Sequence, residues 1–390
     1  MGTVGAMKER EWDVIVAGAG PQGVAAALAA ADGGARTLLL DAADDVGGPL
    51  GPGLLGHWRG DDGLTAPDLL RRLSRRAWGR HIVEPEDFAL AARESLRQAG
   101  VVVMTFCRAV RAKARGGRIR ALTVATAAGR RKLSAWCFVD ATEDWALTRA
   151  GGFGPKASSA LRVTLRARIG GIDTRTPGVF DAEALEQHAD ALHRGQAREE
   201  YPPELVFPQL TPCLRGGTAL LDATPAGLPV GGGPAAWTET VERSRQSALA
   251  AIAFLKATVP GYENCYLIHF AAEPLIIQAG EPPRRRALDD GAGADPDDLP
   301  VLRWCVEAGP ERLATLGHFL CRGAENLLLA RPEATEAVDA PLRMAAGRVA
   351  GQAAALAVLY DGQLAKVDPE RLRRALALRE GDDNEEDAAE

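Results

Sequence analysis

A glycine-rich turn between two apolar runs near the N-terminus constrains this fold more than any other feature. Val14–Ala17 leads into a G-x-G-x-x-G motif at Gly18, Gly20 and Gly23, and Asp41 ends the next apolar run after seventeen intervening residues. In a βαβ unit that binds a dinucleotide, the first glycine permits a tight turn, the second lets the backbone approach a pyrophosphate, and the third lets the helix lie close to the sheet. The terminal carboxylate accepts hydrogen bonds from the adenosine ribose. The pattern predicts a Rossmann-like nucleotide-binding unit.

The surroundings of this motif make it specific. A chain with 43 glycines contains chance matches to G-x-G-x-x-G. Here a strand-like run precedes the motif, the small-residue helix Val24–Ala31 follows it, and the second strand Thr37–Leu40 ends in the carboxylate. The alternative is a tight turn that binds no phosphate.

Composition excludes several classes of protein. With 390 residues, of which 46% are hydrophobic, the chain can bury a large core and form two domains. A net charge of −6, with Lys and Arg spread among acidic residues, argues against a nucleic-acid partner. The short polar segment 1–11 lacks the apolar region of a signal peptide, and no apolar run is long enough to span a bilayer. We therefore expect a cytoplasmic protein without a membrane partner.

The six cysteines carry no metal-binding or disulfide pattern. They include no C-x-x-C, and no histidine cluster stands at ligand spacing. We expect reduced, partly buried thiols and no metal.

The order of the predicted elements indicates an α/β protein with an inserted, mostly antiparallel β-sheet domain. Residues 161–169 alternate apolar and basic side chains, which is typical of a sheet with one solvated face. Further elements are predicted as strands at 101–106, 135–142, 218–221, 265–270 and 326–330, and as helices at 67–78, 85–99, 239–259 and 341–359, with a hairpin at Gly116-Gly117.

The predicted domain organisation follows from these elements. A flexible N-terminus, 1–11, precedes a Rossmann-like domain with a parallel sheet, formed by 12–154 and 321–379. Between its two parts lies a mostly antiparallel β-sheet substrate domain, 155–320. The acidic segment 380–390 is predicted to be a disordered tail, because it has too little apolar surface to fold.

Several signatures in this order resemble the FAD-dependent oxidoreductase family of the glutathione-reductase-like (two-dinucleotide-binding-domain-type) flavoprotein superfold. The signatures are Asp13–Gly23, Asp41 with Val46-Gly47-Gly48, Phe138–Thr142, Ile169–Asp173, Val259–Asn264, Glu325–Leu329, Leu342–Met344 and Gly351–Leu356.

The resemblance implies FAD as the cofactor, and it implies a set of contacting residues. The expected cofactor-binding residues are Gly18, Gly20, Pro21, Gln22, Gly23, Asp41, Gly48, Val110, Ala141, Thr142, Arg343 and Met344. The helix that begins at Pro341 would place its N-terminus beside the flavin and stabilise the reduced anionic ring.

Four departures from the family pattern bear on flavin binding. Glu143 follows Asp-Ala-Thr where the family has glycine, and this carboxylate would repel the phosphates. The late strand continues Ala330-Arg331-Pro332 in place of Ala-Gly-Arg, the segment around Arg284–Arg286 keeps only part of its pattern, and Asp41 replaces the commoner glutamate. Weakened or lost flavin binding is the alternative that these departures raise.

The candidate catalytic residues are His57, Arg285, His318 and Arg331. The resemblance places His57, His318 and Arg331 near the flavin. His57 would act as a base or bind the ring, against the alternative of a histidine satisfied within a loop. Arg285 would bind a substrate carboxylate or the developing charge of the flavin, or else belong to a solvated charge run. Trp58 is interpreted as a core residue.

The predicted function is an FAD-dependent oxidoreductase that oxidises or dehydrogenates a small organic substrate by hydride transfer to flavin N5, as in bacterial specialised metabolism. One alternative is a monooxygenase that uses NAD(P)H and O2, although the sequence has no second G-x-G-x-x-G in a strand-turn-helix context. Another is a non-catalytic scaffold subunit that retains the fold. The sequence is compatible with a homodimer.

Overall fold

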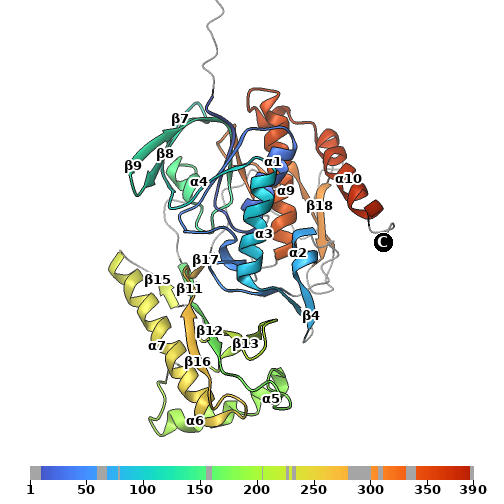
Figure 1. The fold of residues 1–390 in the computed structure, drawn as a ribbon. Coiled ribbons are helices and arrows are strands. Elements are labelled where there is room, and N and C mark those ends of the chain that lie inside the picture. The colour runs from blue at the N-terminus through green and yellow to red at the C-terminus, as the bar shows by residue number, and fades with distance from the viewer. Residues whose placement is uncertain are drawn as a thin grey trace, which may run out of the picture.

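A parallel five-stranded sheet forms the centre of the fold in the computed structural model (Figure 1). Its strands, in spatial order, are β20 (Leu327–Leu329), β10 (Ala135–Asp140), β1 (Trp12–Ala17), β2 (Thr37–Leu40) and β6 (Val102–Met104). Every neighbouring pair is parallel. The α/β class predicted from the sequence is confirmed. The structure describes residues 10–58, 68–77, 80–154, 160–203, 205–224, 228–230, 234–279, 300–305, 311–330 and 340–386.

The strands of this sheet are buried on both faces, which explains their continuous apolar sequences. In β1, Val14 and Val16 face one core, whereas Ile15 and Ala17 face another on the opposite side. The sheet is therefore the middle layer of three.

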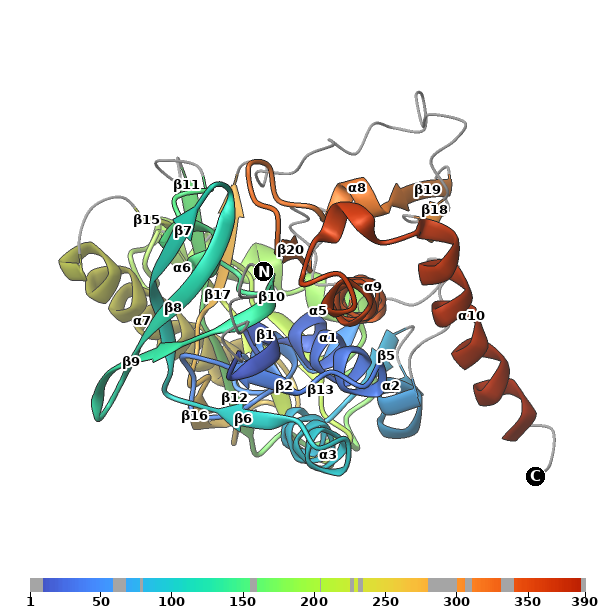
Figure 2. The ribbon, with the colours of Figure 1, turned by 90° about the horizontal axis from the view of Figure 1, so that it is seen from above.

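Three helices cover one face of the sheet: α1 (Pro21–Asp32), α3 (Pro85–Gln98) and α9 (Ala340–Val358). Figure 2 shows α9 directly beside α1. A Cβ on Gly347 would lie 2.0 Å from the carbonyl oxygen of Gln22, and one on Gly351 would lie 2.1 Å from that of Ala26. The backbones of α1 and α9 therefore approach so closely that only glycine fits at these two positions.

The opposite face is covered by an antiparallel meander of β7 (Arg108–Arg115), β8 (Arg118–Thr126) and β9 (Gly129–Leu133). The predicted hairpin is confirmed, with Gly116 and Gly117 at φ values of +58° and +75° in its turn. The buried Asn326 joins this layer to the sheet. Its side chain accepts from Ile119 N–H at 2.9 Å and donates to the carbonyl of Trp136 at 2.9 Å.

The second part of the chain forms antiparallel sheets. One has the order β13 (Gln209–Pro212), β14 (Ala219–Asp222), β12 (Arg166–Gly170) and β16 (Tyr266–Phe270), and another the order β15 (Leu228–Val230), β11 (Ala160–Thr164) and β17 (Leu275–Ala279). Helix α7 (Pro234–Thr258) packs against one face of the four-stranded sheet, where Phe254 and Leu255 meet Ala167 and Ile169. Two shorter helices, α5 (Ala182–Glu186) and α6 (Ala189–Ala197), complete this part of the molecule.

One hairpin packs differently from the expectation. Strands β18 (Pro300–Cys305) and β19 (Glu311–Thr315), followed by α8 (Leu316–Phe319), fall within the predicted substrate domain 155–320. However, Val301, Leu302 and Phe319 belong to the hydrophobic core between the parallel sheet and helices α1, α3 and α9. The physical reason is that these apolar side chains find their burial against the small-residue helix α9.

The C-terminal helix also differs from the expectation. Helix α10 (Pro369–Glu386) begins after Asp368, whose carboxylate accepts from Glu370 N–H at 3.0 Å, as is typical of an N-cap residue. The helix then continues into the acidic segment where disorder was predicted. Extending an existing helix fixes one residue per added hydrogen bond, whereas starting one is costly, so a polar extension follows an anchored first turn. The last four residues lie outside the described residues.

The remaining described elements are short. They are η1 (Gly48–Leu50), β3 (His57–Trp58), α2 (Asp68–Leu73), β4 (Arg75–Ala77), β5 (Arg80–Ile82), α4 (Ala146–Ala150) and η2 (Leu364–Lys366).

Candidate functional site

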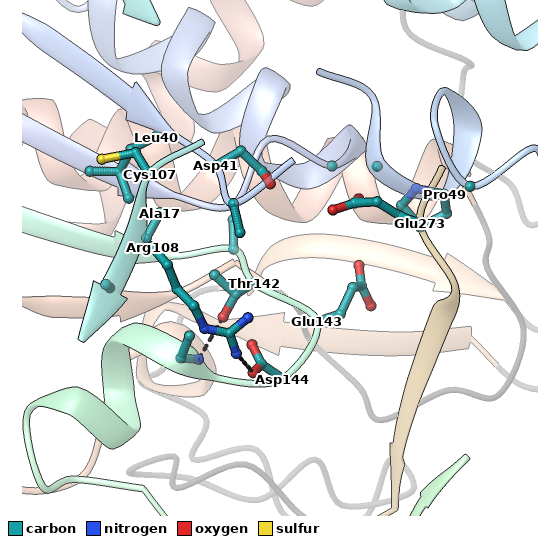
Figure 3. A pocket seen from close by; sticks show the side chains of 18 of the residues that line it. Ala17, Leu40, Asp41, Pro49, Cys107, Arg108, Thr142, Glu143, Asp144 and Glu273 are labelled. Atoms are coloured by element: carbon teal, nitrogen blue, oxygen red, sulfur yellow. Dashed lines mark hydrogen bonds and ion pairs between the residues drawn. The ribbon is translucent and has the colours of Figure 1, made fainter. Parts of the chain in front are cut away.

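A groove lies at the carboxyl ends of β1, β2 and β10 (Figure 3). Ligands of open α/β sheets bind at this edge, where the loops after parallel strands meet. Six of the residues predicted to bind a cofactor line the groove: Gly18, Gly20, Asp41, Gly48, Ala141 and Thr142.

The glycine turn has the geometry that its sequence predicts. Gly18 has a φ of +96°, and a Cβ there would lie 2.6 Å from the carbonyl carbon of Ala141. A Cβ on Gly23 would lie 1.7 Å from the carbonyl oxygen of Gly18. These backbone contacts bring the N-terminus of α1, where Pro21 is the first residue, to the edge of the groove. The positive end of the helix dipole is thus available to an anion.

Asp41 presents its carboxylate at the end of β2. Its oxygens accept hydrogen bonds from the N–H of Ala19 and, at 2.9 Å, from that of Ala43. Burial raises the pKa of Asp41 above its ordinary value, and the backbone hydrogen bonds oppose this shift. Because a carboxylate has about four acceptor sites, Asp41 can still accept from the hydroxyls of a ribose.

The second glycine-rich segment, at Gly47 and Gly48, packs directly against the turn at Gly18–Gly23. Gly47 donates its N–H to the carbonyl of Ala19 at 2.7 Å, and a Cβ on Gly48 would lie 2.9 Å from the Cα of Gly20. Gly48, with Pro49 beside it, therefore continues the wall of the groove away from Asp41.

The negative charge of Glu143 is compensated by neighbouring side chains, whereas the sequence predicted that it would repel the phosphates. Its Oε1 accepts from Arg343 Nη1 at 2.5 Å and from Gln22 Nε2 at 2.9 Å. The side chain of Arg343 is only 7% exposed, and that of Glu143 is 18% exposed. Arg343 is a residue of α9, two hundred positions along the chain, so the sequence alone gave no sign of this partner.

The model of the family described as FAD dependent oxidoreductase matches residues 13–276. The chain belongs to the FAD-dependent oxidoreductase family. FAD is therefore its cofactor, and the predictions of an oxidoreductase and of FAD are confirmed. No curated protein matches the sequence.

Two solved structures share the fold of this FAD-dependent oxidoreductase. A geranylgeranyl bacteriochlorophyll reductase-like protein of Thermoplasma acidophilum is 14% identical, with a TM-score of 0.52, and the alignment covers 95% of this chain and 83% of that one. A triple mutant of the flavin-dependent brominase Bmp2 is 12% identical, with a TM-score of 0.51, and the alignment covers 94% of this chain and 83% of that one.

The groove fits the pyrophosphate and the adenosine of FAD. The glycine turn, where a Cβ on Gly18 would clash with the backbone of Ala141, brings the N-terminus of α1 to the groove, and this helix terminus suits the pyrophosphate. Asp41 suits the ribose, and Cys107, Arg108 and Ala109 line the end beyond it, where the adenine would lie. Val110, the residue predicted there, is 42% exposed and is not part of the lining.

The other predicted cofactor residues lie behind the wall of the groove. Pro21 and Gly23 form the turn, and Gln22 donates to the carbonyl of Ala141 at 2.9 Å, so these three shape the groove without lining it. Arg343 does not line the groove but donates a hydrogen bond to Glu143, which does. Met344 is buried in the hydrophobic core beside α1.

The predicted catalytic residues are not brought together. His57 lies on β3, where Nδ1 is 2.9 Å from Thr211 Oγ1 and Nε2 is 3.4 Å from Arg80 Nη1. His318 is 7% exposed and caps α8, accepting from Thr315 N–H at 2.9 Å. Neither ring lines the groove. Arg285 and Arg331 lie outside the described residues.

Trp58, next to His57, is buried and stacks on His81 with ring centroids 5.2 Å apart, as expected of a core tryptophan.

Asp140 organises the loop that carries Thr142 and Glu143, a role that the sequence reasoning missed. Its fully buried carboxylate accepts from the N–H and hydroxyl groups of Thr142 and Thr148, at distances between 2.5 and 3.1 Å. Burial raises the pKa of Asp140, and the four hydrogen bonds oppose that shift. The signal in the sequence was a lone Asp that ends an apolar strand shortly before two threonines.

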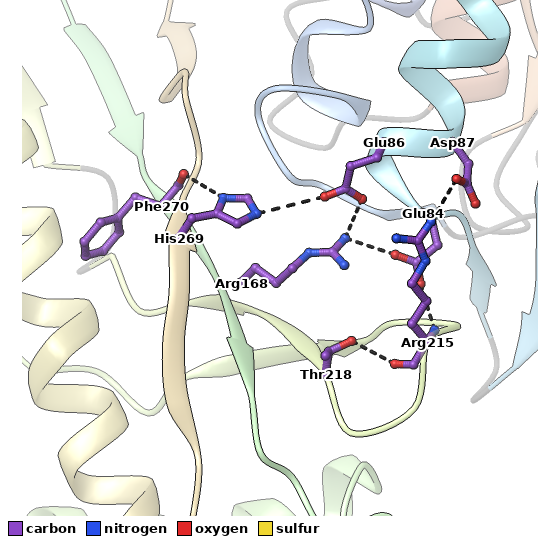
Figure 4. Close-up of polar contacts among 8 residues, drawn as sticks. All are labelled: Glu84, Glu86, Asp87, Arg168, Arg215, Thr218, His269 and Phe270. Atoms are coloured by element: carbon purple, nitrogen blue, oxygen red, sulfur yellow. Dashed lines mark hydrogen bonds and ion pairs between the residues drawn. The ribbon is translucent and has the colours of Figure 1, made fainter.

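A polar cluster joins the antiparallel sheet to the start of α3 (Figure 4). Arg168 Nη2 lies 3.0 Å from Glu84 and 2.8 Å from Glu86. Glu84 also accepts from Arg215 N–H at 2.9 Å, and His269 Nε2 lies 3.9 Å from Glu86. Because these contacts come from β12, β16 and the loop before β14, they fix that sheet relative to the FAD-binding layers.

Two features of the described residues bear on other partners. No helix in the described ranges is long and apolar enough to cross a membrane. No group of three or more His, Cys, Asp or Glu side chains in the same ranges could hold a metal ion.

Proposed function

We propose that this protein oxidises a small organic substrate by hydride transfer to FAD, with the substrate bound between the glycine-rich loop and the antiparallel sheet. The supporting observation is the course of the groove. It runs from Asp41 past Pro49 to Gly53 and then to Leu275, which belongs to the second set of sheets. A ligand that fills this groove therefore ends where the two parts of the molecule meet.

The residues at that boundary would exclude water and hold the substrate. Leu54 follows Gly53 and packs with Leu165 and Leu220 of the second part, in a small apolar cluster. FAD, when bound, supplies the hydride acceptor at N5, so the protein has mainly to orient the substrate.

His57 stays a prediction for the group that takes or gives a proton, because its ring does not line the groove and both ring nitrogens have neighbours. A guanidinium only donates hydrogen bonds, so Arg80 requires a lone pair on Nε2 of His57. The proton of the neutral ring is then on Nδ1, which lies 2.9 Å from the carbonyl of Leu55. We infer this tautomer from the partners. His318, Arg285 and Arg331 stay predictions.

We also propose a division of the chain that modifies the expected one. Segments 12–154 and 321–379 form the FAD domain, and 155–320 forms the substrate domain, except that the hairpin β18–β19 packs with the FAD domain. Within the flavoprotein fold, the likeness to the reductase-like protein and the brominase favours a placement nearer to those two than to glutathione reductase.

A monooxygenase is the second candidate. Its support is the shared fold with a flavin-dependent brominase. The G-x-G-x-x-G motif at Gly18–Gly23 would then serve FAD, and NAD(P)H would bind only transiently.

Anaerobic bleaching of the bound flavin distinguishes the candidates. Small alcohols, amines and acids, and separately NADH and NADPH, are mixed with the FAD-loaded protein, and the visible absorbance is followed. Bleaching by an organic compound and not by NAD(P)H supports the proposed oxidation. Bleaching by NAD(P)H alone overturns it in favour of the monooxygenase.

A further inference from the structure

The outer wall of the FAD groove comes from a distant segment. Residues 271–274 connect β16 to β17 and cross over the glycine-rich loop, where Ala272 donates its N–H to the carbonyl of Pro52 at 3.1 Å. Glu273, Pro274 and Leu275 line the groove as a result. Figure 3 shows the Glu273 side chain beside Pro49, directed towards Asp41.

Four carboxylates line the groove, and three of them have partners. Asp41 accepts from two backbone N–H groups, Glu143 pairs with Arg343, and Asp144 pairs with Arg108 at 2.7 Å and Arg149 at 2.6 Å. The carboxylate of Glu273 makes no hydrogen bond or ion pair with any residue that the structure describes. It is therefore the uncompensated acid in a groove that receives a dianionic pyrophosphate.

The surroundings of Glu273 favour its neutral form. Burial raises the pKa of Glu273 from 4.5 to about 7, and the charges of Asp41, Asp44 and Glu143 act in the same direction. Arg108 is the charged group that opposes the shift. These four groups come from the segment after β2, the loop after β10 and strand β7. Asp144, also in the loop after β10, is paired with Arg108 and Arg149.

We propose that Glu273 contacts FAD in its protonated form and donates its carboxyl O–H to an oxygen of the cofactor. Binding of FAD then takes up one proton from solvent when Glu273 is ionised beforehand. No bond to the cofactor forms or breaks. This inference rests on FAD binding and is independent of the substrate and of the hydride transfer proposed above.

The first test is the pH dependence of FAD affinity. FAD-loaded full-length protein is diluted at several pH values, and the fluorescence of released FAD gives the Kd. If only the protonated form binds, the Kd rises about a hundredfold from pH 6 to pH 9, because one proton is linked to binding. The Glu273→Gln variant keeps a donor but cannot ionise, so its Kd should change by about threefold or less over this range.

A matched control separates this effect from general titration. Glu183 is an exposed glutamate on α5, outside the groove, and Glu183→Gln should follow the wild-type curve. A Glu273→Gln variant that keeps the wild-type pH dependence would overturn the proposal.

A third variant tests the contact itself. Glu273→Leu removes the charge and also the donor, so at pH 6 its Kd should exceed the wild-type value by about fivefold to tenfold, the usual contribution of one hydrogen bond. Equal affinity at pH 6 would overturn the O–H contact.

Calorimetry needs no variant. In two buffers of different ionisation enthalpy, FAD binding to the wild-type protein should take up about 0.9 proton at pH 8 and about 0.1 at pH 6. No proton uptake at pH 8 would overturn the proposal even if the Glu273 variants failed to fold.

Discussion

Replacing Glu143 should have opposite effects on the stability of the protein and on its affinity for FAD. Glu143→Ala leaves Arg343, which is 7% exposed, without its carboxylate partner. Removing one member of a fully buried pair costs about 3–5 kcal/mol. Because Glu143 is 18% exposed, some solvent reaches Arg343, and we expect a loss of about 2–3 kcal/mol in the free energy of unfolding.

A double-mutant cycle isolates the ion pair. Glu143→Gln, Arg343→Met and the combined variant are unfolded in urea without FAD, and tryptophan fluorescence reports the transition. We expect a coupling free energy of about 1–2 kcal/mol, since the charges are 2.5 Å apart and mostly buried. The exposed pair Arg93–Asp45 has the same separation, and its coupling should be about 0.5 kcal/mol or less.

The affinity of Glu143→Ala for FAD, in contrast to its stability, should increase. Without the Glu143 carboxylate, the groove loses one negative charge near the pyrophosphate, so the Kd of Glu143→Ala should fall below the wild-type value. A coupling no larger than that of the exposed pair, together with weaker FAD binding by Glu143→Ala, would refute this reasoning.

Three further perturbations test the packing and charge of the molecule. Gly351→Ala would place its Cβ 2.1 Å from the α1 backbone, so thermal unfolding should reveal a loss of about 1–3 kcal/mol. Gly216→Ala, where a Cβ meets nothing within 4 Å, is the control and should be neutral. Arg168→Met removes the guanidinium that pairs with Glu84 and Glu86, so amide exchange in β12 and β16 should become faster. Unchanged exchange would contradict the role of Arg168 in joining the antiparallel sheet to α3. Because the pKa of Glu273 is raised from 4.5 to about 7 in the folded protein, its protonation stabilises the fold at low pH. The free energy of unfolding of the FAD-free protein should therefore fall as the pH rises from 4.5 to about 7, and this decrease should be absent from Glu273→Gln.

The parts of the site that are close in sequence could be predicted. The turn at Gly18–Gly23 and the carboxylate of Asp41 depend on local backbone geometry and on one strand-to-strand spacing, and both are readable from residue order. The parallel sheet could also be predicted, because strands buried on both faces have continuous apolar sequences.

The charge balance of the groove could not be predicted. Glu143 appears repulsive in the sequence because Arg343 becomes its partner only when α9 packs on α1. Glu273 gave no signal, since it enters the groove through a crossing segment far along the chain. Periodicity shows which face of an element is buried and not which distant side chain it meets.

Retention of FAD by the purified protein tests the central claim most directly. Wild type, Asp41→Ala and the exposed-site control Asp173→Asn are incubated with FAD and desalted, and the visible absorbance of each is recorded. Flavin bands that stay with the wild type and the control, and that are lost from Asp41→Ala, are the predicted result. A wild-type protein without flavin bands, or an Asp41→Ala variant that retains FAD equally well, would contradict the assignment of this groove to FAD.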